Sequence, residues 1–360
     1  CERDVLDRAF SIARRAVAGR GGTLQVLSGL HLELKGNRLT VVGSDLDLIV
    51  RVTVEVGGEK DGSVVLSAQL GSEIVRAFDS GQVEVTVDDD GASVVSGRSN
   101  FSLRVMSSEE YPKFDEPNGE SVTLDAGSVA DALDQVIKAA SLDDARQILT
   151  GVLMAAEEDG LRFVATDSYR LAVRDLPGTA VLGRDQTVLV PSRALDMVRK
   201  ILGGAENLTI RLGERDASFE IDDVQVITRL IEGEFPNYRG LIPDDHPNVL
   251  VVDRIALQEA VGRVRILAQE STPVRLSMSS DGLELVAITQ DVGQAHESLD
   301  ATYEGSDLTV AFNPQFLLDG LEVSPGEEVR LETSEASKPA VLRSMGDEQF
   351  LYLLMPVRVT

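Results

Sequence analysis

Three segments of the chain, at 5–17, 129–137 and 257–267, place apolar residues along one side of an amphipathic helix. Their apolar positions recur at i, i+3, i+4 and i+7, so the sequence predicts three helices. Alternating apolar and polar positions follow each helix and predict strands that are joined by hairpin turns. We expect helix N-caps at Asp4, Ser128 and Asp253, and turns at Gly36-Asn37, Asp90-Gly91, Asp159-Gly160 and Asp281-Gly282.

The pattern is repeated three times with one period. A strand, a small polar corner and a second strand occupy 39–50, 161–173 and 283–292. This alignment makes three corner residues equivalent, at spacings of 122 and 123 residues: Ser44, Thr166 and Thr289. Repeats at a fixed period indicate that one structural unit occurs several times.

Two further markers have the same period. A short strand leads into a second helix at 71–78, 194–202 and 315–321, and the residues Ser67, Pro191 and Asn313 before these helices are 124 and 122 positions apart. Each copy ends in an aromatic residue or Met followed by Pro, at Tyr111-Pro112, Phe235-Pro236 and Met355-Pro356. The sequence therefore predicts an α+β protein of three repeated domains, 1–119, 120–247 and 248–360, each with two helices and about eight strands.

The composition is that of an acidic globular protein. The 360 residues include 34 basic and 60 acidic side chains, a formal net charge of −26, and no Trp. This charge argues against nucleic-acid binding through phosphate contacts alone. A single cysteine forbids an internal disulfide, so a reducing cytoplasm is the simplest compartment. No window holds 18 consecutive apolar residues, and the polar start at Cys1 lacks the apolar core of a signal peptide.

No catalytic or metal-binding constellation stands out. The acidic runs 88–91 and 157–160 lack the ligand spacing of a calcium loop and are better interpreted as hairpin tips. The Gly-rich stretch 19–22 follows a helix and lacks the ending of a phosphate-binding loop. We therefore expect no enzymatic activity, no metal and no cofactor. A hydrolase or metal enzyme built on an unrecognised carboxylate cluster, or an extracellular repeat adhesin, are the alternatives.

Positive charge is concentrated in the predicted helices. The helices, counted together with the residues that flank them, carry 11 basic and 10 acidic side chains, against 34 and 60 in the whole chain. If the helices lined one surface, an acidic protein would present a locally neutral-to-basic face to DNA. Solvated helix faces without a ligand explain the same counts equally well.

The threefold repeat and four ordered motifs resemble the bacterial sliding clamps, the family of the DNA polymerase III beta subunit. The motifs are VATDSYRLAV at 164–173, EFPNY at 234–238, AFNPQF at 311–316 and YLLMPVR at 352–358. The resemblance covers essentially the whole chain, and the family's first strand is expected to be largely missing before Cys1. It implies the DNA clamp fold, a head-to-tail dimeric ring with helices lining the hole, and a non-catalytic processivity factor that encircles duplex DNA, with no exonuclease activity.

The resemblance also implies a pocket for partner peptides. Its walls, transferred by motif position, would be Leu149, Thr166, Ser168, Tyr169, Arg170, Leu171, Pro236, Leu241, Asn313, Phe316, Leu353, Leu354, Met355, Pro356, Val357 and Arg358. Gly240 stands where some relatives have Arg, and no Phe occupies 271–273 where others have one. These departures concern the rim of the pocket and hence its peptide preference.

The remaining expectations concern DNA and self-association. The resemblance implies DNA-facing cations at Arg20, Arg146, Arg14, Arg76, Lys138, Arg193, Arg199 and Lys200, and a dimer interface at Arg98, Phe101, Leu103, Ile266, Leu267 and Glu297. In that interface a first-domain strand would pair with a third-domain edge, and Arg98 would form an ion pair with the neighbour's Glu297. The implied partners are duplex DNA, a second copy, the polymerase alpha subunit, the clamp loader and other clamp-motif peptides, with no membrane.

Overall fold

Two nine-stranded antiparallel sheets organise the chain in the computed structural model, which describes residues 1–19, 24–88, 91–158, 160–179, 181–183, 186–243, 245–268 and 272–358. Each sheet lies in one of two units. The N-terminal unit comprises Cys1–Gly127 and Arg193–Leu230, and the C-terminal unit comprises Ser128–Ser192 and Ile231–Thr360. Each unit also contains one smaller sheet.

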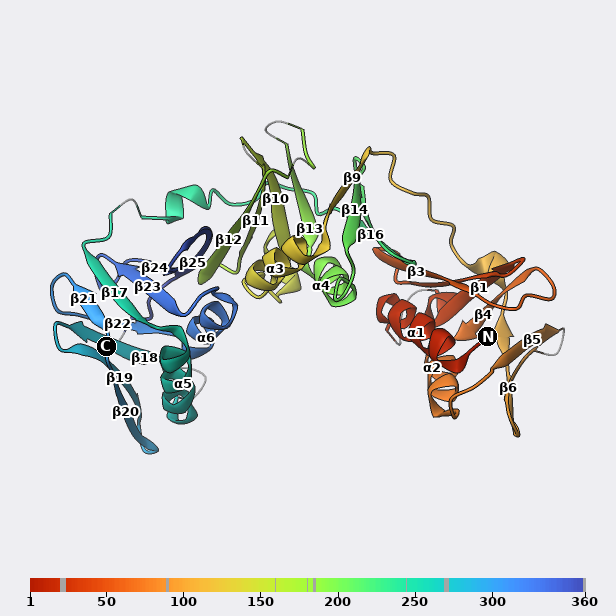
Figure 1. The fold of residues 1–360 in the computed structure, drawn as a ribbon, viewed down its shortest axis with the longest axis horizontal. Coiled ribbons are helices and arrows are strands. Elements are labelled where there is room, and N and C mark those ends of the chain that lie inside the picture. The colour runs from red at the N-terminus through yellow and green to blue at the C-terminus, as the bar shows by residue number, and fades with distance from the viewer. Residues whose placement is uncertain are drawn as a thin grey trace. The chain divides into compact units, whose positions relative to one another are not determined.

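The N-terminal unit packs helices against its large sheet. The strand order is β8 (Val105–Met106), β4 (Gly62–Ser67), β1 (Gly29–Lys35), β2 (Arg38–Ser44), β3 (Leu48–Glu55), β16 (Val224–Arg229), β15 (Asp216–Ile221), β14 (Asn207–Leu212) and β9 (Ser121–Asp125). The helices are α1 (Arg3–Ala13), α2 (Ala68–Ala77) and all but the first residue of α4 (Ser192–Ile201), with short 3-10 turns η1 (Arg14–Ala16), η2 (Gln25–Ser28) and η3 (Ser108–Glu110). Helix α1 packs on α2, β2 and β3 (Figure 1).

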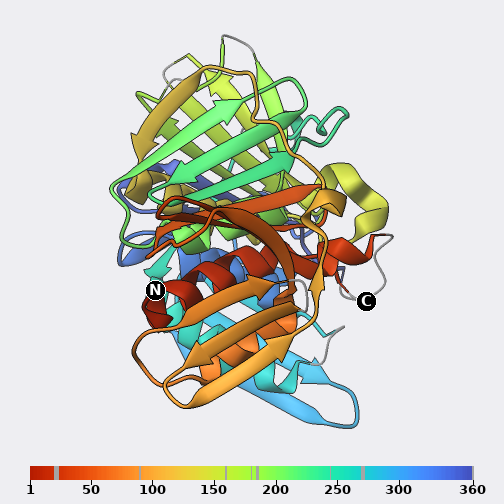
Figure 2. The same cartoon turned by 90° about the vertical axis from the view of Figure 1, so that its right-hand side faces the viewer.

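A small sheet completes this unit. It consists of β5 (Glu84–Asp88), β6 (Gly91–Ser96) and β7 (Ser99–Leu103), in that order, so β5 and β7 are its edges. Figure 2 shows this sheet nearest the viewer, with α1 behind it. An isolated bridge between Glu2 and Gln82 ties the start of the chain to the approach to β5.

The C-terminal unit has the same layers. Its large sheet has the order β13 (Thr187–Pro191), β10 (Gly151–Glu157), β11 (Gly160–Thr166), β12 (Arg170–Pro177), β25 (Asp347–Leu354), β24 (Ala340–Ser344), β23 (Glu328–Thr333), β17 (Asn248–Asp253) and β21 (Thr302–Glu304). Its small sheet has the order β20 (Gly293–Leu299), β19 (Gly282–Thr289), β18 (Val274–Ser279) and β22 (Leu308–Phe312). The helices are α5 (Arg254–Val264), α6 (Pro314–Val323) and most of α3 (Ala126–Ile137), with η4 (Asp144–Thr150), η5 (Arg239–Leu241) and η6 (Arg265–Leu267).

The predicted repeat is confirmed in secondary structure. Among the described residues, the three thirds contain two α-helices each and eight, eight and nine strands. The equivalent corner residues Ser44, Thr166 and Thr289 end β2, β11 and β19. Two positions after each of them the backbone has a positive φ, at Leu46 (85°), Ser168 (79°) and Asp291 (62°). Non-glycine residues seldom adopt this conformation, so its threefold recurrence marks one structural unit.

The central third contributes to both units. Its strand β16 pairs with β3 in the N-terminal unit, whereas its strand β12 pairs with β25 in the C-terminal unit. The two packing units therefore cut across the predicted repeats. The repeat boundaries at 119/120 and 247/248 stay a prediction.

The helix starts confirm one predicted cap and correct two. Asp253 is the N-cap of α5, and its Oδ1 accepts a hydrogen bond from the Ala256 N–H at 2.7 Å. Asp4 and Ser128 are not N-caps, because α1 begins at Arg3 and α3 at Ala126, which places both residues inside the helices. Both helices begin before the first apolar residue of the pattern, which is Val5 in α1 and Val129 in α3, so the pattern does not fix the first residue. Asp4 still lies in the first turn, where a negative charge is favourable.

Segments between the thirds pack on their own apolar clusters. In the N-terminal unit Tyr111 packs with Val42 and Ile49, and its hydroxyl donates to the Val42 carbonyl at 3.3 Å. In the C-terminal unit Tyr238 belongs to a buried cluster with Leu171 and Leu353. Figure 1 shows this second segment on the side of the sheet away from α5 and α6. These segments are therefore anchored parts of the fold.

Candidate functional site

The corner between β11 and β12 is held by its own polar side chains. Thr166 Oγ1 donates to the Arg170 carbonyl at 2.7 Å and accepts from the Ser168 N–H at 3.1 Å. Asp167 Oδ1 accepts from the N–H groups of Tyr169 and Arg170 at 2.9 and 3.0 Å. These bonds hold Ser168 in its left-handed conformation, and the Tyr169 side chain is left 59 % exposed.

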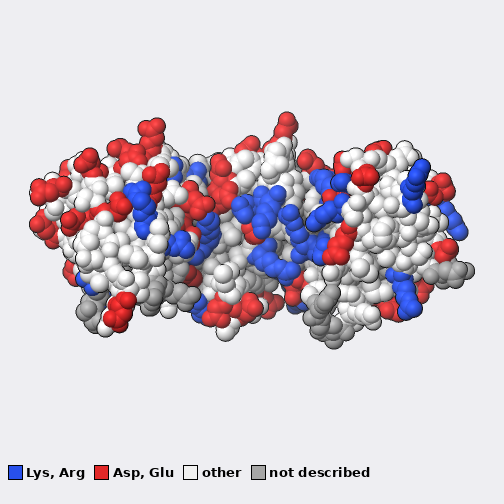
Figure 3. Space-filling model, turned by 90° about the horizontal axis from the view of Figure 1, so that it is seen from below, with Lys and Arg blue, Asp and Glu red and all other residues white. Residues whose placement is uncertain are grey.

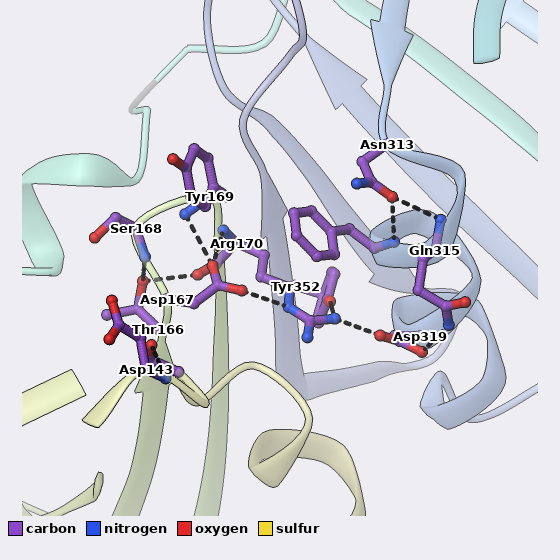
Figure 4. A network of polar contacts seen from close by, with 12 residues as sticks. Asp143, Thr166, Asp167, Ser168, Tyr169, Arg170, Asn313, Gln315, Asp319 and Tyr352 are labelled. Carbon is purple, nitrogen blue, oxygen red and sulfur yellow. Dashed lines mark hydrogen bonds and ion pairs between the residues drawn. The ribbon is translucent and has the colours of Figure 1, made fainter. Parts of the chain in front are cut away.

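Arg170 joins this corner to α6 and β25 (Figure 4). Its Nε donates to Asp167 Oδ2 at 3.0 Å, and its Nη1 donates to Asp319 Oδ2 at 2.5 Å and to the Tyr352 hydroxyl at 3.2 Å. Its Cζ lies 4.4 Å from the centroid of the Phe316 ring, a cation–π distance. The guanidinium therefore connects two strands and one helix of the C-terminal unit.

Burial and the neighbouring polar groups have opposite effects on the pKa of the Arg170 guanidinium. Burial acts to lower the pKa of the Arg170 guanidinium, but contacts with Tyr352, Asp319 and Asp167 outweigh it and raise the pKa above its usual value. Burial also raises the pKa of the Tyr352 hydroxyl. Arg170 is thus charged and Tyr352 neutral in the folded protein, which is the arrangement that their hydrogen bond requires.

The start of α6 supplies the facing wall. Asn313 is its N-cap, and the Asn313 Oδ1 accepts from the N–H groups of Gln315 and Phe316 at 2.8 and 3.3 Å. The rings of Tyr169 and Phe316 are roughly parallel, with centroids 6.3 Å apart. The Met355 N–H donates to the Tyr169 carbonyl at 2.8 Å, which brings the exposed Met355 beside the corner.

The segment η4 is tied to the same corner. Arg146 Nη1 donates to the Asp167 carbonyl at 2.9 Å, while its Nε and Nη2 donate to Asp143 and Ser141. Leu149, a predicted wall residue, is half-buried at the end of η4. Every nitrogen of the Arg146 side chain therefore has a partner within the protein, which leaves little of its charge for DNA.

The remaining predicted wall residues are mostly apolar. Pro236 and Leu241 are exposed on the segment that precedes β17, and Val357 is exposed after β25. Leu171, Leu353 and Leu354 are almost fully buried, and the first two pack in one apolar cluster with Tyr238. Pro356 is half-buried, and Arg358 is exposed at the end of the described chain. An apolar surface with a few fixed polar groups is typical of a peptide-binding site.

The structure joins more polar residues than the resemblance implies. The contacts above connect Thr166, Ser168, Tyr169, Arg170, Asn313, Phe316 and Met355. Asp167, Asp319, Gln315 and Tyr352 were missed. Gln315 Nε2 donates to Asp319 Oδ1 at 2.7 Å, and the i, i+4 spacing of these two residues on a predicted helix was a signal for this contact.

The rim positions have distinct surroundings. Gly240 lies in η5, and an added Cβ would meet only the Asn237 side chain, at 3.6 Å from Nδ2 and 4.0 Å from Cγ, which is ordinary van der Waals contact. Ser271 lies outside the described residues. Thr272 is half-buried, and its hydroxyl accepts from the Thr289 hydroxyl at 3.2 Å.

Most of the predicted DNA-facing cations are paired with carboxylates. Lys138 pairs with Glu322 at 2.6 Å, Arg193 with Asp45, and Arg199 and Lys200 both with Asp196. Arg76 lies 3.8 Å from Asp7, whereas Arg14, in η1, has no ion-pair partner among the described residues. Arg20 lies outside them. Figure 3 shows groups of blue side chains, some of them with red side chains next to them.

The predicted interface residues lie on two sheet edges and a short helix. Phe101 and Leu103 are on β7, an edge of the small N-terminal sheet, and Arg98 immediately precedes β7. Ile266 and Leu267 are in η6, and Glu297 is on β20, an edge of the small C-terminal sheet. Phe101 and Ile266 are exposed, and the Phe101 ring also contacts Phe78.

Within the described ranges, no group of three or more His, Cys, Asp or Glu side chains is arranged to hold a metal ion. In the same part of the chain, every helix is too short or too polar to span a bilayer.

Comparisons with known proteins find matches to each third of the chain. Three family models match in order: the N-terminal domain of the DNA polymerase III beta subunit at 1–115, its central domain at 123–237 and its C-terminal domain at 239–358. The beta sliding clamp of Streptomyces coelicolor is 36 % identical over 373 residues, covering 100 % of this chain and 98 % of the relative.

Solved structures of sliding clamps share the fold. The Bacillus subtilis clamp is 28 % identical with a TM-score of 0.93, covering 100 % of this chain and 98 % of that one. The Bartonella birtlesii clamp, solved bound to griselimycin, is 29 % identical with a TM-score of 0.95, covering 99 % and 98 %. The chain therefore belongs to the bacterial beta sliding clamps, the non-catalytic subunit of DNA polymerase III that makes replication processive.

Proposed function

We propose that two copies of this chain close head to tail into a ring around duplex DNA. Each copy offers two different sheet edges, β7 and β20, with an exposed Phe101 beside one and an exposed Ile266 near the other. An unpaired edge strand invites association, and pairing of unlike edges in two copies satisfies both. The three repeats, 1–119, 120–247 and 248–360, would each contribute one sixth of the ring.

The pairing of helix cations with carboxylates supports the proposal that the ring slides along DNA. Lys138, Arg193, Arg199 and Lys200 each have a carboxylate partner, so the helices offer DNA only a moderate positive potential. Phosphate contacts carry no sequence information, and weak ones allow movement along the duplex. A closed ring holds DNA by topology, so a net charge of −26 is compatible with this function.

We further propose that the Tyr169–Met355 corner of the C-terminal unit binds the clamp-binding peptides of the polymerase alpha subunit, the clamp loader and other partners. The observation that supports this best is the exposed Tyr169 beside Phe316 and Met355, on a corner fixed by Asp167 and Arg170. A preformed apolar surface reduces the ordering cost of binding a short peptide. Griselimycin, bound in the Bartonella birtlesii clamp structure, is a ligand to test at this corner. Acting on the bacterial chromosome, the protein would be cytoplasmic.

Retention on DNA tests the ring. The chain, loaded by a clamp loader onto nicked circular duplex, is expected to stay bound through gel filtration, and linearising the DNA should release it within minutes. The matched sample is the same DNA linearised and blocked at both ends by a bound protein, which should restore retention. Equal retention on open linear and circular DNA would contradict the ring.

A further inference from the structure

Asp319 holds two partners through its two carboxylate oxygens. Oδ2 accepts from Arg170 Nη1 at 2.5 Å, and Oδ1 accepts from Gln315 Nε2 at 2.7 Å. The Asp319 side chain is 13 % exposed and that of Arg170 is 10 % exposed. Because the Asp319 side chain is largely buried and both of its oxygens already accept hydrogen bonds, it is not placed to bind a ligand. Its role is to hold the side chains that it contacts. The contact spans 149 positions in the sequence, so it also ties α6 to β12.

The same guanidinium covers the Phe316 ring. The distance of 4.4 Å between the Arg170 Cζ and the ring centroid places the cation over one face of Phe316. Phe316 in turn faces the exposed Tyr169 ring. Release of Arg170 from Asp319 would uncover this face and let both rings change their orientation. The orientation of the Phe316 and Tyr169 rings thus depends on the hydrogen bond between Arg170 and Asp319.

One nitrogen of Arg170 remains available. Nε is taken by Asp167, and Nη1 is taken by Asp319 and the Tyr352 hydroxyl. Nη2 has no hydrogen-bond partner among the described residues, and it is not one of their buried unsatisfied atoms. A guanidinium has five N–H groups in one plane, so fixing two of its nitrogens also fixes the direction of the third.

We propose that Asp319 and the Tyr352 hydroxyl are positioning residues of the peptide-binding corner. They hold Arg170 against Phe316 and aim its Nη2 at a carbonyl oxygen of the bound peptide, without touching the peptide themselves. This inference rests on the proposed function, because it assumes that the corner binds peptides. Its energetic basis is preorganisation, since a guanidinium already held in place loses little freedom when the peptide binds.

Substitutions on α6 and β25 test the proposal. The probe is a fluorescein-labelled peptide with the clamp-binding segment of a bacterial polymerase alpha subunit, and its dissociation constant is measured by fluorescence anisotropy. Asp319→Asn in the full chain is expected to weaken binding about tenfold, the loss of one charge-assisted hydrogen bond that orients a contact. Tyr352→Phe keeps the buried ring and is expected to weaken binding about threefold.

The control variant is Asp347→Asn. Asp347 Oδ2 accepts from Arg174 Nη1 at 2.7 Å, an Arg–Asp pair that joins β12 to β25, the two strands that also carry Arg170 and Tyr352. Its loss should lower the melting temperature and leave peptide affinity within about twofold of the unmodified chain. Asp319→Glu keeps the carboxylate and is expected to lose less affinity than Asp319→Asn.

A spectroscopic readout separates positioning from stability. In a chain labelled with ¹⁵N-arginine, the side-chain N–H protons of Arg170 should exchange slowly with solvent in the unmodified protein and in Asp347→Asn. The NMR signal of these protons should broaden in Asp319→Asn. Unchanged affinity and unchanged Arg170 signals in folded Asp319→Asn and Tyr352→Phe would overturn the inference, as would equal losses of affinity in Asp319→Asn and Asp347→Asn. Absence of peptide binding by the unmodified chain would instead refute the proposed function.

Discussion

Arg263 on α5 and Glu297 on β20 form an ion pair within one chain, with the Arg263 Nε 2.8 Å from the Glu297 Oε1 and Nη2 3.2 Å from Oε2. The hydrogen bond from Arg263 lowers the pKa of the Glu297 carboxyl. The family resemblance implies an ion pair between Glu297 and Arg98 of a second copy. In the structure this carboxylate already has a partner, so an added Arg98 would share it. The interface should therefore depend on apolar contacts more than on this pair.

The first prediction concerns the dimer. Phe101→Asp should weaken dimerisation at least about tenfold, because it removes an apolar contact and places a charge at the edge of β7. Arg98→Ala should change the dimer free energy by less than about 1 kcal/mol. Sedimentation velocity over a range of concentrations measures both effects. Val87→Asp is the control, since Val87 lies on the opposite edge, β5, and is 45 % exposed against 42 % for Phe101. Dissociation by Val87→Asp and not by Phe101→Asp would refute the assigned edge.

The second prediction concerns the peptide site. Met355→Ala and Tyr169→Ala should each weaken binding of a polymerase alpha peptide about tenfold and leave the dimer intact, because both side chains are exposed at the corner. Surface plasmon resonance with immobilised peptide measures the affinity. Met345→Ala is the matched control, since Met345 is 44 % exposed in the turn before β25, against 37 % for Met355. If both corner variants bind as well as Met345→Ala does, the site is misplaced.

The third prediction concerns DNA. Arg14→Gln should reduce the salt dependence of duplex binding by a slope of about 0.9, the value for one lost phosphate contact. Lys138→Gln should change the slope less, because Glu322 at 2.6 Å already neutralises that ammonium group. Fluorescence anisotropy of labelled duplex across a salt series gives both slopes. A larger change for Lys138→Gln would show that the ion pair opens on DNA.

The fourth prediction concerns pH and His31. The His31 ring stacks on Tyr111 with a centroid distance of 5.0 Å, and burial lowers the pKa of the imidazole. The unfolded chain therefore binds a proton more readily than the folded chain, and stability is lost as the pH falls through the usual histidine range and below it. His31→Phe, which keeps a ring for stacking, should show a smaller drop in melting temperature between about pH 7 and about pH 5. His296→Gln, at an exposed site on β20, should behave like the unmodified chain. An equal drop in all three proteins would contradict the assignment.

Local sequence patterns predicted the elements well because helices and hairpins depend on near neighbours. The second helices of each third were placed within about three residues of α2, α4 and α6. The equivalence of Ser44, Thr166 and Thr289 was confirmed by the positive φ two residues after each. Two N-caps were wrong, because amphipathic periodicity does not mark the first residue of a helix.

The sequence by itself determined the threefold repeat, the two helices of each third, the fold class and the positions of the site motifs. Helices, hairpins and motifs depend on near neighbours, and the repeat is the same local pattern found three times along the chain. Only the tertiary structure decided which charged side chains form ion pairs. Arg170 reaches Asp319 across 149 positions and Tyr352 across 182. Contacts between residues so far apart depend on how β12, β25 and α6 pack, and no local periodicity records that packing. For the same reason, the number of helix cations indicated only that the helices are relatively basic. The carboxylate that pairs with each cation determines how much of its positive charge is left for DNA.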